Sequence, residues 1–383
     1  MLGRDRVFWR GRHAVLGWGS PLGKVHRDGT RVLIACGFEE VDTSTTRVPA
    51  FFWNTRRAAD FPAIGEGLPL IRLLPQACTD ALDDKVRCAR LLNAAGFVAA
   101  GLVPESFVDL AALQEILERS VTEQQEEAAW EEAREDRRQR RLYFVKHRFG
   151  VKGQAVRPMR EDALAMWLQD GISHVRGRSE QQFVVQAEVP PAVDASGRKF
   201  VLRCHVLVAC RAASPPAAWF HHDVITLAHA VPYDVDGTDK AIHVSQSGKG
   251  HPPPQLLSEL PPTHPAAGES LPSHLRGLVT RMLAAAAPEL IPVPRCQRAT
   301  LYTLLGLDVA LSNRGAPMLL EVNSHPAIAD GTMSGVPTAV YTRLVQDVLS
   351  LLVLPALDGV EPRAGGFDCL PHAFASSLAI SVE

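Results

Sequence analysis

The chain has 383 residues, 46% of them hydrophobic, and its formal net charge is -2. This length and hydrophobic content suffice for two or three small domains with a sizeable core. The nearly balanced charge excludes a global attraction to nucleic acid or to an anionic membrane, so a charged partner would have to bind a local patch.

Cysteine usage and the N-terminus point to a reducing cytoplasmic environment. The cysteines are scattered and include no CxxC pair, so we expect neither a disulfide framework nor a zinc site. The first 15 residues lack an uninterrupted apolar stretch, which argues against a signal peptide. Residues 345–354 are apolar but too few to span a bilayer. We therefore expect neither nucleic acid nor membrane as a partner.

The first third of the chain is predicted to be mixed. Residues 1–75 indicate a small α/β lobe with a β-type run at 31–35. A helix is expected from Asp84-Lys85 to a C-terminal cap at Gly96, followed by an extended segment at 103–107 and a helix at 108–117. Residues 120–141 are acidic first and basic later, an order that suits a helix dipole. We interpret them as a solvated helical insertion, although the basic end could instead contact an acidic partner.

The rest of the chain is richer in strand patterns. A Pro-rich stretch at 251–273 indicates an exposed loop, and two apolar strands around the turn Ser312–Gly315 indicate a hairpin. Strands are predicted at 142–146, 182–186, 200–209, 302–311 and 318–323, and helices at 275–287 and 337–354. The fold class is therefore α+β.

The hairpin carries candidate metal ligands. Glu321 and Asn323 are two residues apart on one strand, so their side chains share a face, whereas Val322 turns into the core. If Asp308 pairs across the hairpin on that face, three oxygen donors converge. Mg²⁺ prefers such oxygen ligands and completes its shell with phosphate and water. A magnesium site is the prediction, although either carboxylate alone would usually be an exposed strand residue.

Cations upstream could bind an anion. Lys146 ends a strand before a turn that contains Gly150 and Gly153, an arrangement that can fold over phosphate, but taken alone the signal is weak. Lys199 and Arg203 share one strand face, and if that face is buried they require an anion such as a phosphate or a carboxylate. An exposed edge strand is the alternative. His243 lies in a polar loop, where a lone histidine is usually structural or solvated.

The order of these motifs resembles the tubulin–tyrosine ligase-like family over residues 83–352. The most specific parts are Gly197-Arg198-Lys199-Phe200 with Arg203, and the run Leu319 to Pro326. The resemblance implies an ATP-grasp fold, with mixed and antiparallel sheets and ATP held between a central and a C-terminal lobe. The implied division is an N-terminal α/β lobe at 1–105, a central lobe at 106–185 with the charged insertion, a C-terminal lobe at 186–355 with the Pro-rich loop, and a tail at 356–383.

The resemblance also implies roles for individual residues. Lys199, Arg203 and Glu321 would be catalytic, and Asp308, Glu321 and Asn323 would bind magnesium, with two ions expected. Residues implied to bind ATP are Lys85, Lys146, Gly150, Val151, Lys152, Gly153, Gln186, Ala187, Glu188, Val189, Lys199, His243, Val244, Ser245 and Gln246. Within this set, Lys146 would bind phosphate, residues 150–153 would form the phosphate loop, and 186–189 would hold adenine largely through backbone groups.

The implied activity is ATP-dependent ligation of a free amino acid to a protein carboxylate through an acyl-phosphate. The acceptor would be tubulin or another protein with an acidic tail, in the cytoplasm and associated with the cytoskeleton or with cilia or flagella. The chain departs from the family where Val201 replaces an acidic residue and Ala187-Glu188 replaces Lys-Tyr. Two alternatives follow: a catalytically weakened, nucleotide-binding partner of tubulin, or an ATP-grasp enzyme acting on a small molecule.

Overall fold

The computed structural model describes residues 5–10, 13–18, 39–41, 49–53, 70–127, 141–148, 150, 155–169, 182–211, 214–245, 250–291, 299–324, 326 and 338–374. Several predictions from the sequence lie outside these residues. They are the β-type run at 31–35, the loop residues Val151, Lys152 and Gly153, the loop residue Gln246, positions 128–140 of the charged insertion, and positions 375–383 of the tail.

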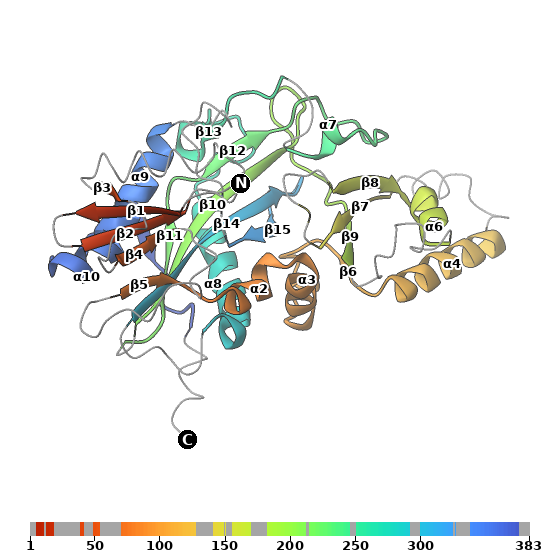
Figure 1. Ribbon diagram of the computed structural model, residues 1–383. Helices are drawn as coiled ribbons and strands as arrows, with labels where there is room; N and C mark the ends of the chain where they lie inside the picture. The colour runs from red at the N-terminus through yellow and green to blue at the C-terminus, as the bar shows by residue number, and fades with distance from the viewer. Residues whose placement is uncertain are drawn as a thin grey trace.

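A small antiparallel sheet forms one part of the molecule (Figure 1). Its strands, in the spatial order β6-β9-β7-β8, are β6 (Ser106–Phe107), β9 (Phe183–Ala187), β7 (Leu142–His147) and β8 (Val156–Arg160). Helices α4 (Leu110–Glu127) and α6 (Glu161–Gln169) cover one face by packing on Tyr143, Val145 and Val185. Since side chains alternate along a strand, Phe144, Lys146 and Gln186 lie on the other face.

Among the described residues, twelve further strands form one large mixed sheet. Pairing is parallel for β2–β4, β4–β5 and β5–β14, and antiparallel elsewhere. The strands are β1 (Asp5–Arg10), β2 (His13–Trp18), β3 (Glu39–Val41), β4 (Pro49–Trp53), β5 (Leu70–Leu73), β10 (Phe200–Cys210), β11 (Ala217–His221), β12 (Ile225–Ala228), β13 (Gln255–Leu256), β14 (Ala299–Leu311), β15 (Pro317–Asn323) and β16 (Phe367–Cys369).

Helices cover both faces of the large sheet (Figure 1). Strand β10 shows the consequence, because all its residues are buried: Cys204 and Val206 face the layer of α8, whereas Leu207 faces the layer of α9. The helices are α2 (Gln76–Asp83), α3 (Lys85–Ala94), α7 (Lys240–His243), α8 (Leu271–Leu290), α9 (Thr338–Val348) and α10 (Leu354–Asp358), with a 3-10 turn at Leu257–Glu259 and a π-helical segment at Leu349–Val353. No helix within the described residues is long and apolar enough to cross a membrane.

The structure confirms several predicted elements and corrects others. The hairpin forms as β14 and β15, and α3 ends before Gly96, whose φ of 76° lies in the left-handed region that glycine tolerates. The Pro-rich stretch was wrongly predicted as one exposed loop. It contains β13, which pairs with β12 and buries Leu256, and it runs into the start of α8.

The predicted domain boundaries at 105, 185 and 355 stay predictions. The large sheet nevertheless combines strands from both sides of the first boundary, because β5 pairs in parallel with β14. The predicted mixture of parallel and antiparallel strands with helices is confirmed.

Asp84 fixes the junction between α2 and α3. Its side chain accepts hydrogen bonds from the backbone N–H groups of Val86 and Arg87, at 3.0 and 3.2 Å, and so caps α3. Its second oxygen accepts from Arg148 Nε at 2.5 Å, which ties the helix to the end of β7. The helix start at Lys85 is thus held beside the loop that follows Lys146.

Replacing Asp84 by alanine is expected to lower the free energy of unfolding by about 2–4 kcal/mol, because both the cap and a charge-assisted hydrogen bond are lost. Asp84→Asn keeps a capping oxygen and removes only the charge, so its loss should be smaller. Denaturant titration of both variants measures the difference. Equal stability of Asp84→Ala and the wild type would contradict the capping role.

Candidate active site

A cavity of about 340 Å³ lies between the two sheets. It brings together residues that are far apart in the sequence. Those predicted from the sequence that line it are Lys146, Gln186, Ala187, Glu188, Val189, Lys199, Arg203, His243, Val244, Ser245, Asp308, Glu321 and Asn323. Their roles remain predictions, but their convergence on one cavity is a fact of the fold.

Sequence reasoning missed most of the apolar wall. The further lining residues are Phe144, Val156, Pro191, Phe200, Val201, His229, Ala310, Leu311, Leu320 and Pro326. For Phe144 a signal existed, because it precedes Lys146 by two positions on one strand and so shares its face. An apolar wall with a few polar groups is typical of pockets that bind small molecules.

The hairpin places two carboxylates opposite each other. Asp308 on β14 pairs with Glu321 on β15, and Gly306 pairs with Asn323, with a β-bulge between Asp308 and Val309. Val322 is buried on the other face, as predicted. Gly306 cannot carry a larger side chain without displacement, because a Cβ there would lie 2.7 Å from Pro326 Cβ. The predicted pairing across the hairpin is therefore confirmed.

Each of these carboxylates also has a cationic partner. Arg203 donates to both oxygens of Asp308, at 2.5 and 3.1 Å, and Lys85 Nζ lies 3.2 Å from Glu321 Oε1. Burial opposes the charged form of Arg203, but the adjacent Asp308 outweighs it and raises the pKa of the guanidinium. These side chains form an alternating set of charges along one end of the cavity.

The donor set fits magnesium in chemistry. Within the described part of the chain no group of three His, Cys, Asp or Glu residues gathers to hold a metal by itself. Two carboxylates and the amide of Asn323 supply oxygen ligands only, and Mg²⁺ commonly uses one or two carboxylates and takes its other ligands from phosphate and water. The predicted ligands would thus hold magnesium together with a bound phosphate, rather than as a closed site.

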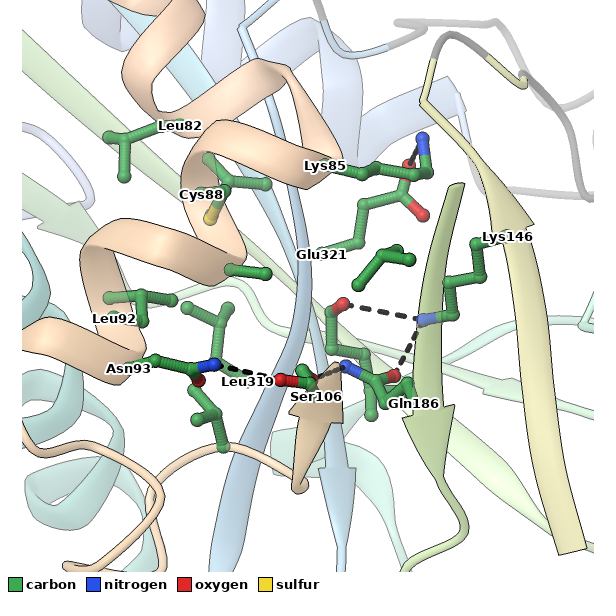
Figure 2. A pocket seen from close by; sticks show the side chains of 15 residues that line it. Leu82, Lys85, Cys88, Leu92, Asn93, Ser106, Lys146, Gln186, Leu319 and Glu321 are labelled. Atoms are coloured by element: carbon green, nitrogen blue, oxygen red, sulfur yellow. Dashed lines mark hydrogen bonds and ion pairs between the residues drawn. The ribbon is translucent and has the colours of Figure 1, made fainter. Parts of the chain in front are cut away.

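Lys146 is a buried cation at the same end. Its side chain is 9% exposed, and its ammonium donates to Gln186 Oε1 at 2.6 Å and approaches the Leu320 carbonyl oxygen at 3.5 Å. Burial lowers the pKa of Lys146 to about 8. Lys85 lies on the far side of Glu321 and also donates to the Gly150 carbonyl at 2.9 Å (Figure 2).

Lys199 lies deeper along the cavity in a cluster of its own. Its ammonium forms an ion pair with Glu188 and donates to His243 Nδ1 at 2.8 Å. The ring of Tyr233 lies 4.6 Å from it, and the Tyr233 hydroxyl donates to Glu188 at 3.2 Å. Burial lowers the pKa of Lys199, and burial together with the Lys199 charge lowers the pKa of His243 to about 4, so that His243 is neutral and can accept this hydrogen bond.

The sequence-based view of these cations needs a correction. Lys199 and Arg203 do share a buried strand face, but the anions that they were expected to take from a ligand are provided by Glu188 and Asp308. The alternative of an exposed edge strand is excluded, because β10 lies between β12 and β14. His243, expected in a polar loop, is buried at the end of α7.

The backbone at 186–189 offers fewer groups to a ligand than expected. The N–H of Ala187 donates to the Glu105 carbonyl and the N–H of Glu188 donates to the Leu142 carbonyl, both at 2.8 Å. Within the described residues the N–H of Val189 has no such partner. A nucleotide base held by this backbone would therefore receive its hydrogen bond from Val189.

Comparisons with known proteins point in one direction. No family model matches the chain. It is 26% identical over 206 residues to the probable tubulin polyglutamylase TTLL9 of Bos taurus, covering 50% of this chain and 43% of that protein. It is 26% identical over 247 residues to the protein of the same name from Rattus norvegicus, covering 58% of this chain and 52% of that protein. The chain thus spans about half the length of the curated relatives that it matches.

Proposed function

Because the chain is a divergent relative of the tubulin–tyrosine ligase-like family, we propose that it is an ATP-dependent ligase with an ATP-grasp fold that joins an amino acid to a protein carboxylate. The observation that carries the proposal is the cavity in which the oxygen donors Asp308, Glu321 and Asn323 lie near the buried ammonium of Lys146. Oxygen ligands for magnesium beside a buried cation suit a nucleotide triphosphate.

The residues of the cavity have distinct parts in the proposed reaction. Bound Mg-ATP would supply the phosphoryl group that activates the acceptor carboxylate as an acyl-phosphate, which the amine of the second substrate then attacks with release of phosphate. Lys146 holds negative phosphate oxygens, and Asp308, Glu321 and Asn323 hold magnesium. Arg203 lies beside Asp308 and neutralises charge on the transferred group. Positioning and charge stabilisation are the main contributions that such a transfer needs from a protein.

The acceptor is proposed from the relatives' names, which describe tubulin polyglutamylases. We propose tubulin, or another protein with an acidic tail, as acceptor and a free amino acid as co-substrate. This places the protein in the cytoplasm with the cytoskeleton, including cilia or flagella. The finer activity, whether glutamylation, glycylation or tyrosination, is a matter for the labelled amino acid that is transferred.

A transfer assay tests the proposal. Purified protein is incubated with Mg-ATP, tubulin and a mixture of labelled amino acids, alongside Glu321→Gln and the exposed control Glu259→Gln. Label on tubulin with the wild type and with Glu259→Gln, but not with Glu321→Gln, supports ligation. ATP turnover without labelled protein would replace the proposed acceptor by a small molecule.

One observation favours a second candidate, a nucleotide-binding protein with weakened catalysis. Glu188 provides Lys199 with a carboxylate from within the chain, and Val201, which lines the cavity, replaces an acidic residue of the resembled family. In the transfer assay this candidate gives ATP binding without either label transfer or ATP turnover.

Glu188→Gln is expected to strengthen ATP binding. The change removes a negative charge from a cavity that binds an anion, and at an effective dielectric of about 20 a charge about 8 Å away contributes about 2 kcal/mol, or more than tenfold in affinity. The same change should lower the unfolding temperature, because Lys199 loses its carboxylate partner while it stays buried. Calorimetric titration of ATP measures the first effect. Weaker binding by Glu188→Gln than by Glu259→Gln would show instead that Glu188 contacts the ligand.

A further inference from the structure

A continuous chain of hydrogen bonds leads from α3 to Lys146 (Figure 2). Asn93 Nδ2 on α3 donates to the Ser106 carbonyl on β6 at 2.7 Å. Gln186 Nε2 on β9 donates to Ser106 Oγ at 3.2 Å, and Gln186 Oε1 accepts from Lys146 Nζ on β7 at 2.6 Å. Four elements of the fold thus act on the position of one ammonium group.

The strand register explains why these side chains meet. Ser106 pairs directly with Gln186, and Gln186 pairs directly with Phe144, so the three side chains lie on one face of the small sheet. Lys146 follows on the same face, two positions along β7, and is a diagonal neighbour of Gln186. The opposite face is filled by the core beneath α4 and α6. The hydrogen-bond chain therefore faces the cavity side only.

The hydroxyl of Ser106 sets the orientation of the Gln186 amide. Ser106 Oγ donates its proton to the Pro104 carbonyl at 2.9 Å, so its lone pair is what meets Gln186. Only the amide NH₂ can donate to that lone pair, and the amide oxygen is thereby turned toward Lys146. The reverse orientation would set NH₂ donors against an ammonium. The side chain of Gln186 is thus committed to Ser106 and Lys146 and is not available to a nucleotide base.

The consequence for Lys146 is a restriction of its donors. An ammonium has three N–H donors on a flexible stem. Gln186 Oε1 accepts one, and the Leu320 carbonyl lies 3.5 Å away in the direction of a second. The remaining donor is left for the cavity that contains Asp308 and Glu321. Without the Gln186 oxygen, the buried ammonium would lose its shortest hydrogen bond and its fixed direction.

We propose that Ser106 and Gln186 are positioning residues: Ser106 orients the Gln186 amide, and Gln186 aims the Lys146 ammonium at the phosphate of the nucleotide. This inference rests on the proposed function, because it assumes that Lys146 contacts phosphate. It also revises the role that the resemblance implied for Gln186, from a group beside adenine to a group that acts through Lys146.

A small second cavity decides which variants are informative. It has a volume of about 40 Å³ and is lined by Cys88, Asn93, Ser106, Lys146 and Gln186 among others. Since one water needs roughly 10–15 Å³ of such volume, water can enter and partly replace the hydroxyl in Ser106→Ala. Gln186→Leu removes both ends of the amide and is the stronger test. Gln186→Glu keeps an oxygen toward Lys146, and Ser106→Thr keeps the hydroxyl, so these two are the conservative partners.

The experiment combines binding with a spectroscopic signal of Lys146. Affinities for Mg-ATP and Mg-GTP are measured by calorimetry for the wild type and the four variants. The NMR signal of the Lys146 side chain is followed in protein labelled with [ε-¹³C]lysine and assigned by Lys146→Met. We expect Gln186→Leu to bind both nucleotides at least about tenfold more weakly, with a moved Lys146 signal, because a hydrogen bond to a charged group is lost. Ser106→Ala should change both in the same direction by less, and Ser106→Thr and Gln186→Glu should restore them.

Three results would overturn the inference. One is unchanged Mg-ATP affinity in Gln186→Leu. Another is a loss for Mg-ATP without a loss for Mg-GTP, which would make Gln186 a reader of the base. The third is a Lys146 signal that stays in place in both Gln186→Leu and Ser106→Ala. If the wild type binds no nucleotide, the proposed function fails, and the Lys146 signal alone still decides whether Ser106 and Gln186 hold this ammonium.

Discussion

Glu321→Gln is expected to lower Mg²⁺-dependent turnover at least about 100-fold, because a metal ion supplies several kcal/mol of charge stabilisation in the transition state. The glutamine keeps the size of the side chain and one oxygen but loses the charge that holds the metal. Asp308 opposite is already paired with Arg203 and cannot replace it. A magnesium titration of the turnover rate measures the effect, with a midpoint moved to higher concentration in the variant.

Two comparisons make this result specific. Glu259→Gln removes an exposed carboxylate elsewhere and should leave both the rate and the magnesium midpoint unchanged. Lys85, which lies 3.2 Å from Glu321, loses an ion-pair partner in Glu321→Gln. If the rate falls but the magnesium midpoint does not move, the effect comes from Lys85 and not from a metal ligand, and the assignment of Glu321 is wrong.

Lys146→Met is expected to weaken Mg-ATP binding about 30-fold or more at pH 7, because truncating a buried, hydrogen-bonded charge in an interface costs about 2–5 kcal/mol. Arg363→Met, the loss of an exposed cation, is the matched control and should leave the affinity unchanged. Calorimetric titration of both variants gives the comparison. Equal affinities of Lys146→Met and the wild type would remove Lys146 from the site.

The pH dependence of binding distinguishes Lys146 further. Its pKa is lowered from 10.5 to about 8, mainly by burial, with Lys85 acting in the same direction and Glu321 and Asp308 in the other. The ammonium therefore loses its proton as pH rises through about 8. Wild-type affinity should fall toward that of Lys146→Met over this range, whereas the variant should show no such midpoint. For folding, the depressed pKa adds stability above pH 10.5 that is lost as pH falls through about 8.

Local patterns in the sequence predicted the parts of the site that lie within single hairpins and strands. The turn at Ser312–Gly315 and the alternation around it were enough to place Asp308 opposite Glu321, because a hairpin leaves few choices of register. The shared face of Lys199 and Arg203 followed in the same way from a side-chain period of two. The bulge between Asp308 and Val309 had no signal in the pattern.

Contacts between the two sheets could not be predicted in this way. Glu188 meets Lys199, and Gln186 meets Lys146, only because β9 and β7 of the small sheet stand against β10 and β15 of the large one. Nothing in the spacing of these residues fixes that arrangement. The parallel pairing of β5 with β14 joins segments more than 200 positions apart and is likewise a product of the whole fold. This explains why the cations were expected to need a ligand anion and instead have partners in the chain.

The central claim is that the cavity between the two sheets is a Mg-ATP site. Its most direct test is a calorimetric titration of ATP into the wild type, with Mg²⁺ and with Mg²⁺ removed by chelation, repeated for Lys146→Met and for Glu321→Gln. We predict one saturable site whose affinity is raised by Mg²⁺, lowered by Lys146→Met under both conditions, and made insensitive to Mg²⁺ by Glu321→Gln. Absence of saturable binding, or binding that neither substitution changes, would contradict the claim.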